Sequence, residues 1–454
     1  MERPLGGRAA LSDSTADTET LVSRSRSLTD VSPCDLLDCT VRPLVRWRAP
    51  DGIDVVGCGE AARLRATGLD RFDSVRTQAS TVFERIAHDG PAIARPRAFG
   101  GFAFHDDRSP PSSSPWNGFD RAQFVIPRVQ LTETTGETWL TVVDAPESID
   151  DAIRSWHDRV TDGTIDREPD RSLGETASGH PAVVDSVRST EIGEWRDQIE
   201  AAIADIESTP LEKIVLAQAR TNDLDRPIRL AATLAQLGRR YPDCYRFAFS
   251  GLGSATFFGV PPERLVAKTD ERIDTEALAG SAPRGSLPAT DETYASHLET
   301  SQKITNEHEL VVESIERQLE PLADRIDVGD RRVKRLATIQ HLRTPISGTL
   351  AGERHVLDVV EALHPTPAVG GVPQQRALDA IRSIESFDRG WYAAPVGWFD
   401  ADGDGEFAVA IRSGVAADRR ITLFAGNGIV AGSDPDAEWD EVELKFKPIL
   451  EELR

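Results

Sequence analysis

The C-terminal stretch AGNGIVAGSDPDAEWDEVELKFKPIL, residues 425–450, joins a glycine-rich loop to the start of a helix. Asp434 before Pro435 predicts that start, because an aspartate side chain caps free N–H groups and proline suits the first helical position. Offsets of three and four place three charged residues on one face of the helix: Glu438, Glu441 and Lys445. Two carboxylates and an ammonium can hold a hard cation together with an anionic ligand. The stretch therefore predicts metal-assisted chemistry on a carboxylate or phosphate, against the alternative of a solvated acidic face.

The length and the net charge of the chain limit the architectures and the partners that are possible. A chain of 454 residues can form two or three ordinary domains or one large α/β unit. The net charge of −23 argues against nucleic acid and anionic membranes as partners, because both need a basic surface. Only six lysines occur, and Lys213 is the first. This acidic, lysine-poor and arginine-using composition fits either a halophilic organism or a GC-rich genome.

The cysteines and the N-terminus indicate the compartment. The four cysteines form no CxxC pair, so neither a zinc site nor a disulfide framework is expected. The first 30 residues or so lack the apolar stretch of a secretory signal. No run of about 18 apolar residues predicts a transmembrane helix. We expect a cytoplasmic protein.

Composition shifts predict the organisation of the chain. We expect a flexible segment over 1–30, a region completing the sheets over 31–161, a surface connection over 162–189 and a catalytic domain over 190–454. An apolar stripe over Ile192–Ile206 predicts a core helix, and Glu212–Gln218 predicts a strand that begins near Lys213. A second long helix is expected over about Glu292–Leu322, carrying Glu307. Strands and helices without regular alternation predict an α+β architecture.

One acidic run imitates a metal site. Residues 400–405, DADGDG, match the first half of a calcium-binding EF-hand loop. The twelfth position is Ile411, where that loop needs a bidentate glutamate. We therefore expect a turn between two strands here.

Several short motifs occur in one order along the chain. They are Lys213-Ile214-Val215-Leu216-Ala217, Pro262-Glu263-Arg264-Leu265, Leu278-Ala279-Gly280-Ser281, Glu307-His308, Gln340-His341-Leu342, Leu363-His364-Pro365-Thr366-Pro367, Arg389-Gly390-Trp391-Tyr392, Ala410-Ile411-Arg412-Ser413, and the stretch from Ala425 to Trp439. This set resembles the chorismate-utilising enzymes, and within them the isochorismate synthases. The resemblance is dense from Thr190 to the C-terminus and thinner before it. It implies a chorismate-binding α+β fold, in which two layered α/β subdomains with antiparallel sheets surround a central cleft.

The resemblance also implies a reaction and two catalytic roles. The reaction is the Mg²⁺-dependent isomerisation of chorismate to isochorismate, in which water adds at C2 and the C4 hydroxyl leaves. Lys213 matches the family's general base, which must be a neutral amine to take a proton from water. Glu263 matches the general acid that protonates the departing hydroxyl, a role that suits a carboxyl with a raised pKa. Without the resemblance, Glu263 would be assigned to a salt bridge with Arg264, and Glu276 is the competing acid.

Further positions match the family's metal and substrate contacts. Glu307 and Glu441 match direct Mg²⁺ ligands, and Glu438 lies nearby, binding directly or through water. Some relatives have an acidic residue three positions before Glu307, where this chain has Ile304. The matched substrate positions are Gly280, Ser281, His341, Tyr392, Arg412 and Lys445.

The subfamily assignment depends on two positions. Lys213 indicates that water is the group added at C2. Relatives that add ammonia at C2 instead resemble one another in having a glutamine at the position of Lys213. Ala279 stands where relatives that install an amino group at C4 have a nucleophilic lysine. We therefore expect chorismate as the small-molecule substrate and no glutaminase subunit as a partner. Menaquinone synthesis is the expected pathway, with a siderophore or salicylate route second.

Two alternatives stay open at this stage. A salicylate synthase would share the lysine, the acid and the metal set, and would then eliminate pyruvate. Ala368, after Pro367, is a weak indication against that elimination. From another class, the chain could be an inactive chorismate-binding subunit, although Lys213, Glu263, Glu307 and Glu441 are all present.

Overall fold

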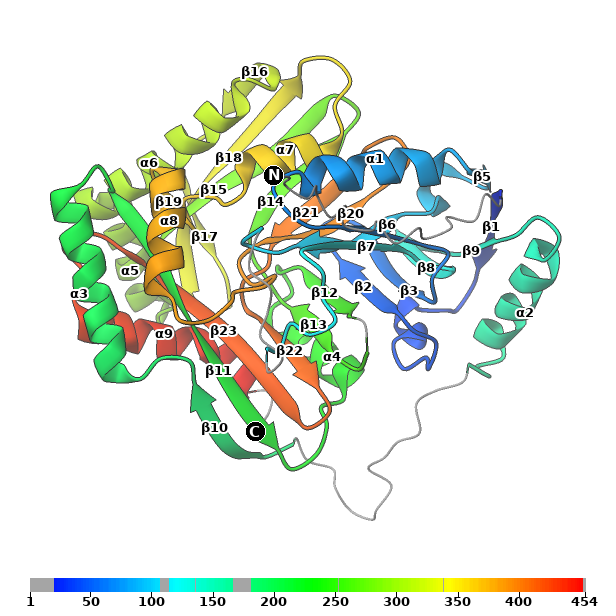
Figure 1. Ribbon diagram of the computed structural model, residues 1–454, viewed down its shortest axis with the longest axis horizontal. Helices are drawn as coiled ribbons and strands as arrows, with labels where there is room; N and C mark the ends of the chain where they lie inside the picture. Colours follow the sequence, from blue (N-terminus) through cyan, green and yellow to red (C-terminus); the bar gives the residue numbers. More distant parts are fainter. Residues whose placement is uncertain are drawn as a thin grey trace, which may run out of the picture.

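Two large sheets, antiparallel except for one parallel strand pair, form the centre of the protein, and helices cover their outer faces (Figure 1). The computed structural model describes residues 20–106, 114–134, 136–165, 181–251, 253–337 and 339–451. Within these ranges, no helix combines the length and the apolar character that crossing a membrane requires. The predicted α+β fold with antiparallel sheets is confirmed.

The first sheet contains the strand that begins at Lys213. Its strands, in spatial order, are β10 (Val183–Arg188), β11 (Lys213–Leu224), β23 (Arg420–Ile429), β22 (Ser413–Ala417), β13 (Thr256–Gly259), β12 (Arg246–Ser250), β2 (Leu44–Arg48), β3 (Asp54–Cys58), β8 (Val129–Thr134), β9 (Glu137–Asp144), β1 (Leu21–Leu28) and β5 (Ile86–Asp89), with β19 (Gly371–Val372) beside β11. Strands from both ends of the chain therefore share one sheet.

The second sheet contains the strand that follows Glu263. Its order is β16 (Ala323–Val328), β18 (Ile339–Leu350), β15 (Arg272–Pro283), β14 (Arg264–Thr269), β21 (Gly405–Val409), β20 (Pro395–Phe399), β6 (Ala98–Phe102), β7 (Ala122–Ile126) and β4 (Ala62–Ala66), with β17 (Arg332–Arg335) beside β18. Every second residue of β18 from Gln340 is buried, so one face of this strand packs on the core.

The helices lie on the outer faces of the sheets. They are α1 (Arg71–Phe83), α2 (Ile149–Thr161), α3 (Ile192–Ser208), α4 (Leu230–Arg240), α5 (Pro288–Thr300), α6 (Gln302–Leu319), α7 (Val356–Leu363), α8 (Gln374–Ile384) and α9 (Pro435–Leu450), with short 3₁₀ turns at Pro33–Leu36 and Ala92–Ala94. Helix α8 packs against β11 and α9 packs against β23, whereas α5 and α6 both pack against β15 (Figure 1).

The predicted start of α9 is confirmed. The Asp434 side chain accepts a hydrogen bond of 2.9 Å from the Ala437 N–H, and Pro435 is the first helical residue. The predicted core helix is α3, in which Trp195, Ile199 and Ala202 are buried. Ile192, in its first turn, is instead exposed.

The single helix expected over about 292–322 is wrong, because the chain forms α5 and α6 with a break at Ser301. Ser301 has φ −70° and ψ 114°, which is an extended conformation. Its N–H donates to the carbonyl of His297, and its own carbonyl accepts from the N–H of Thr305. Ser301 thus ends one helix and begins the next, a position at which serine is favoured.

Parts of two expected irregular segments are strands. Within the segment expected to be flexible over 1–30, Leu21–Leu28 forms β1, which pairs with β9 and β5. Within the expected connection over 162–189, Val183–Arg188 forms β10 along β11. Residues 1–19 and 166–180 lie outside the described residues. Both strands depend on partners far away in the sequence, which local composition does not reveal.

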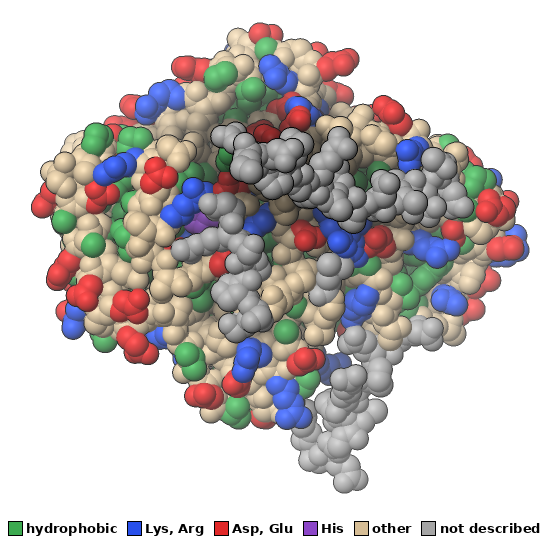
Figure 2. All heavy atoms as spheres, in the orientation of Figure 1, with side chains coloured by type: hydrophobic (Ala, Val, Ile, Leu, Met, Phe, Trp, Pro, Cys, Tyr) green, Lys and Arg blue, Asp and Glu red, His purple; other side chains and the backbone are tan. Residues whose placement is uncertain are grey.

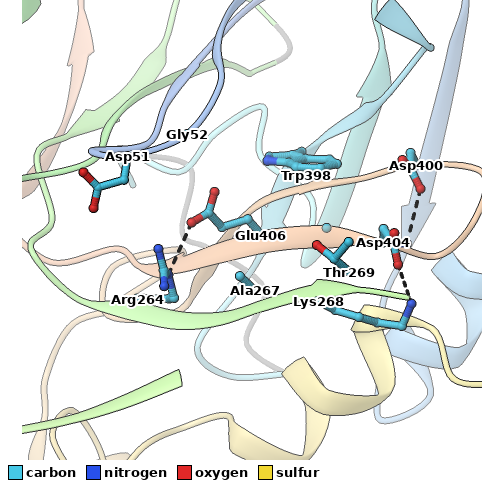
Figure 3. A pocket seen from close by; sticks show the side chains of 11 residues that line it. Asp51, Gly52, Arg264, Ala267, Lys268, Thr269, Trp398, Asp400, Asp404 and Glu406 are labelled. Atoms are coloured by element: carbon cyan, nitrogen blue, oxygen red, sulfur yellow. Dashed lines mark hydrogen bonds and ion pairs between the residues drawn. The ribbon is translucent and has the colours of Figure 1, made fainter. Parts of the chain in front are cut away.

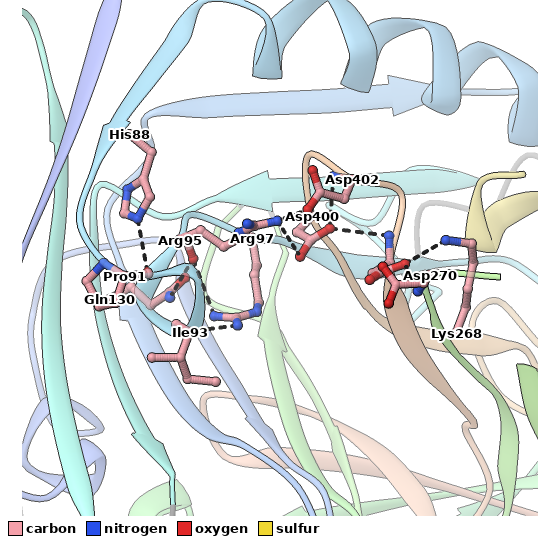
Figure 4. Close-up of polar contacts among 11 residues, drawn as sticks. His88, Pro91, Ile93, Arg95, Arg97, Gln130, Lys268, Asp270, Asp400 and Asp402 are labelled. Carbon is pink, nitrogen blue, oxygen red and sulfur yellow. Dashed lines mark hydrogen bonds and ion pairs between the residues drawn. The ribbon is translucent and has the colours of Figure 1, made fainter. Parts of the chain in front are cut away.

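The acidic run over 400–405 is a turn between β20 and β21, as predicted. Figure 4 shows its carboxylates facing basic side chains and backbone amides. Asp400 accepts from the N–H groups of Asp402 and Asp404, Asp402 pairs with Arg95, and Asp404 lies 2.6 Å from Lys268 Nζ. These carboxylates are therefore paired with protein groups within and beside the turn.

A buried ion pair anchors the inner side of β11. Arg389 and Glu385 have side-chain exposures of 0% and 2%, and Arg389 Nε lies 2.9 Å from Glu385 Oε2. Arg389 donates to the carbonyl of Val215, whereas Glu385 accepts from the N–H of Ala217. Both partners therefore hold the strand that carries Lys213.

Removing one partner of this pair should strongly destabilise the fold. We expect Arg389→Ala to lower the free energy of unfolding by about 3–5 kcal/mol, because the Glu385 carboxylate would stay buried without compensation. Denaturant unfolding followed by circular dichroism measures this change. Arg317→Ala is the control, since Arg317 is exposed and should contribute at most about 1 kcal/mol. Equal effects of the two substitutions would contradict this account of the pair.

Candidate active site

Lys213 lies at the start of β11, buried against α6 and β23. Its side chain is 5% exposed, and its Nζ lies 2.7 Å from Glu307 Oε1 on α6. Across the sheet, a Cβ placed on Gly428 would lie 2.9 Å from Lys213 Cε. A side chain at position 428 would have to displace the end of this lysine, so the glycine-rich loop noted in the sequence shapes the site of the predicted base.

Filling this space should reduce catalysis. We expect Gly428→Ala to lower kcat by about 10²-fold, because displacing a reacting group by about 1 Å has an effect of that size. Steady-state kinetics measures the change. Gly432→Ala is a matched control in the same segment, since its Cβ would meet nothing nearer than Lys303 Nζ at 3.8 Å. A Gly428→Ala protein with unchanged kcat would show that the close contact has no role in placing Lys213.

Glu263 is a buried carboxyl without a salt bridge to its neighbour. It is 6% exposed, and its carbonyl accepts from the N–H of Val409 on β21. Arg264 points elsewhere, and its Nε lies 2.9 Å from Tyr245 Oη. The same Nε lies 3.3 Å from Glu406 Oε1 (Figure 3). The alternative of a salt bridge to Arg264 is therefore wrong.

Burial decides the protonation of Glu263. Desolvation, followed by the charge of Glu276, raises the pKa of Glu263 to about 8, although Lys334 and Lys213 act in the opposite direction. A carboxyl with this pKa holds its proton at neutral pH. Glu263 thus has the property that a general acid needs.

Glu276 is buried to the same degree but is ionised. Burial alone would raise its pKa, but Lys334 and Arg343 outweigh burial, so that the pKa of Glu276 lies below its usual value. Lys334 Nζ lies 2.9 Å from Glu276 Oε1, and Arg343 donates to the other carboxylate oxygen. This difference separates the two acid candidates, because only Glu263 carries a proton to donate.

Helix α9 places the charged face that carries Glu438, Glu441 and Lys445 against the end of β23. Lys445 Nζ lies 2.8 Å from Glu441 Oε1 and donates to the Gly426 carbonyl at 2.9 Å. The Asn427 side chain accepts from Lys445 and donates to Glu438 Oε2 at 3.1 Å. Asn427 therefore connects two candidate site residues, a role that the sequence did not predict.

His341 lies on the β15–β18 side of the site. Its Nδ1 is 3.0 Å from Ser281 Oγ and 3.1 Å from the Gly280 carbonyl. Burial, followed by the charge of Arg412, lowers the pKa of His341 to about 3, so the ring is neutral at physiological pH. Gly280 has a φ of +70°, and a Cβ there would lie 2.4 Å from Ile304 Cγ2. A side chain at this position would disrupt the contact with α6.

Three cations gather near His341 in a chain whose net charge is −23. Figure 2 shows acidic and basic side chains interspersed over the visible face. In the site, Arg412, Lys445 and Lys334 all lie close enough to His341 to lower its pKa. Arg412 has a φ of +49°, a rare conformation for a residue with a side chain. The three cations give local positive charge for an anionic ligand.

Tyr392 lies beside β23. Its ring stacks on Phe424 with centroids 5.4 Å apart, and it is 4% exposed. Burial raises the pKa of Tyr392, and the charges that influence it are those of Arg389 and Glu385. The structure thus connects Tyr392 to the anchor of β11.

The chain is similar to known proteins over almost its whole length. A family model described as chorismate binding enzyme matches residues 8–454. The isochorismate synthase MenF of Bacillus subtilis (strain 168) is 31% identical over 448 residues, covering 95% of this chain and 93% of that protein. The salicylate biosynthesis isochorismate synthase of Pseudomonas aeruginosa is 32% identical, covering 100% of this chain and 93% of that protein.

Two solved structures share the fold. The menaquinone-specific isochorismate synthase MenF from Escherichia coli has a TM-score of 0.80 at 26% identity, covering 96% of this chain and 95% of that one. Anthranilate synthase component I from Streptococcus pneumoniae has a TM-score of 0.74 at 19% identity, covering 88% of this chain and 93% of that one. At that identity the second likeness concerns the fold alone.

Proposed function

This chain belongs to the chorismate-binding enzyme family, and from this membership and the geometry of its site we propose that it is an isochorismate synthase. It converts chorismate to isochorismate by adding water at C2 and releasing the C4 hydroxyl as water. One water enters and one leaves, so the product is an isomer of the substrate. The names of its relatives support menaquinone synthesis as the pathway.

The observation that carries the proposal is the presence in one site of a buried lysine, Lys213, and a buried, protonated carboxyl, Glu263. Lys213 and Glu263 lie near enough for the charge of the lysine to act on the acid. Lys213, acting as the base, takes a proton from the water that attacks C2. Glu263 gives its proton to the C4 oxygen, and the ring double bonds shift as the C–O bond breaks. Acid and base thus act on opposite ends of one displacement.

The substrate's two carboxylates would bind to the positive side of the site. Arg412 offers a planar guanidinium suited to a carboxylate, and Lys445 offers a second cation. Ser281 and the backbone of Gly280 lie next to His341, where they can contact the ring. His341 is neutral and would position the substrate, and Tyr392 would contact it from the β23 side.

Mg²⁺ is the proposed cofactor, and the donor set fits it. Glu307, Glu441 and Glu438 supply the carboxylate oxygens that Mg²⁺ prefers. Burial and then the charge of Glu441 raise the pKa of Glu438, and a cation among these groups would offset that repulsion. Among the described residues no three acidic, histidine or cysteine side chains already cluster as a metal site. Mg²⁺ usually keeps waters and shares ligands with its substrate, so a cage of three carboxylates is not required. When bound, Mg²⁺ neutralises charge on the ring carboxylate.

Product analysis tests the proposed function. The purified chain alone is incubated with chorismate and Mg²⁺ at high salt, with and without a chelator, and the products are separated by chromatography. We expect isochorismate without pyruvate, and no product when the metal is removed. Salicylate with pyruvate would instead identify a salicylate synthase. Unchanged chorismate with a folded protein would identify an inactive chorismate-binding subunit.

A further inference from the structure

Lys334, on β17, contacts the residue before Glu263 and lies opposite His341 on the neighbouring strand. Its Nζ is 3.2 Å from the carbonyl of Pro262, the residue before Glu263, and 2.9 Å from Glu276 Oε1. Lys334 also pairs directly across the strands with His341 on β18. It is one of only six lysines, and none of the family motifs in this sequence includes it.

Both contacts of Lys334 act on the segment that holds Glu263. The bond to Pro262 fixes the backbone from which the acid projects. The ion pair with Glu276 fixes the carboxylate whose charge acts most strongly on Glu263. Arg343 completes the arrangement by donating to the second oxygen of Glu276.

We propose that Lys334 and Glu276 are positioning residues that together place the general acid Glu263 and, as a cation and an anion beside it, act in opposite directions on its proton. The inference rests on the proposed function. Lys334 and Arg343 stabilise Glu276 as a carboxylate, and this anion then disfavours a second negative charge on Glu263. Two neighbouring carboxyls are thereby given different protonation states, as acid catalysis requires.

The charges around Glu263 predict opposite effects for the two partners. The groups that act on it are Glu276 on β15, Lys334 on β17 and Lys213 on β11. Neutralising Glu276 removes a repelling anion, so Glu263 should lose its proton at lower pH. Neutralising Lys334 removes an attracting cation, while Arg343 still keeps Glu276 ionised, so Glu263 should hold its proton to higher pH.

The pH dependence of kcat/KM tests this inference. The alkaline limb of the unaltered enzyme should report loss of the Glu263 proton, with a midpoint expected near pH 8. We expect Glu276→Gln to move this midpoint down by about one pH unit and Lys334→Gln to move it up by about one. Lys334→Arg keeps the charge and should leave the midpoint in place. A purely structural role would lower the rate without moving the limb.

A second readout separates this inference from the proposed function. Infrared spectroscopy follows the protonated carboxyl of Glu263, identified by its absence in Glu263→Gln, without any turnover. Opposite shifts of its titration in the two variants support the inference even if the chain forms no isochorismate. Shifts in the same direction, or no shift in either variant, would overturn it. If Lys334→Gln does not fold, Glu276→Gln and Lys334→Arg still give the predicted downward shift and unchanged midpoint.

Discussion

Lys213→Ala should lower kcat by about 10³-fold, within the range that a positioned acid–base group contributes. Alanine removes the only group proposed to take a proton from the attacking water. The same variant should still fold, because the Glu307 side chain, at 27% exposure, can be solvated once its partner is gone. Single-turnover kinetics with saturating chorismate measures the rate of the chemical step.

Lys268→Ala is the matched control for this prediction. Lys268 is as buried as Lys213, at 4% side-chain exposure, and is likewise paired, with its Nζ 2.6 Å from Asp404 Oδ1. It lines a separate pocket of about 290 Å³ with Arg264, Trp398 and Glu406 (Figure 3). We expect its loss to reduce stability and leave kcat unchanged. If Lys213→Ala kept more than about a tenth of its kcat, the lysine could not be the base.

Glu263→Gln should lower kcat by about 10²- to 10⁴-fold and at the same time stabilise the protein at alkaline pH. Glutamine keeps the size of the side chain and cannot donate the proton. Because the amide carries no charge at any pH, it also removes the cost of ionising a buried carboxyl. Loss of activity with a gain in stability distinguishes an acid held in an unfavourable environment from a residue that merely supports the fold.

The sign of the stability change follows from proton binding. The pKa of Glu263 is about 8 in the folded protein, above the usual value of 4.5. Between these values the folded state binds more protons than the unfolded state, so this group lowers stability as pH rises. At pH 5 Glu263→Gln should change little, whereas above pH 8 it should add up to about 4 kcal/mol.

Thermal and denaturant unfolding at several pH values measure this difference. Glu313→Gln on α6 is the control, because Glu313 is 64% exposed and its replacement should change stability by at most about 0.5 kcal/mol. An equal effect of Glu263→Gln at pH 5 and pH 9 would contradict the raised pKa.

Local signals in the sequence predicted some elements and missed others. The start of α9 was predictable because Asp434 and Pro435 act on the residues next to them. The break at Ser301 was not, since serine is compatible with both a helix interior and a cap. Strand β10 was missed because it is defined by its pairing with β11, and its residues are almost all exposed. The order of strands in both sheets likewise depends on contacts between distant segments.

The candidate site was predicted residue by residue from the family resemblance, but its electrostatics were not. Choosing between Glu263 and Glu276 requires knowing that Lys334 and Arg343 form ion pairs with Glu276. Asn427 appeared in a quoted motif, and nothing in the sequence showed that its side chain joins Lys445 to Glu438. The scarcity of lysine was the one signal that could have drawn attention to Lys334.

The central claim is that Lys213 activates a solvent water for attack at C2 while Glu263 releases the C4 hydroxyl. Isotope labelling tests it most directly. The reaction is run in ¹⁸O-labelled water, and the oxygen at C2 of isochorismate is examined by mass spectrometry. The account predicts one ¹⁸O atom at C2 in every product molecule formed in the forward direction. Unlabelled isochorismate would mean that the hydroxyl migrates within the substrate, and it would contradict the assigned roles of both residues.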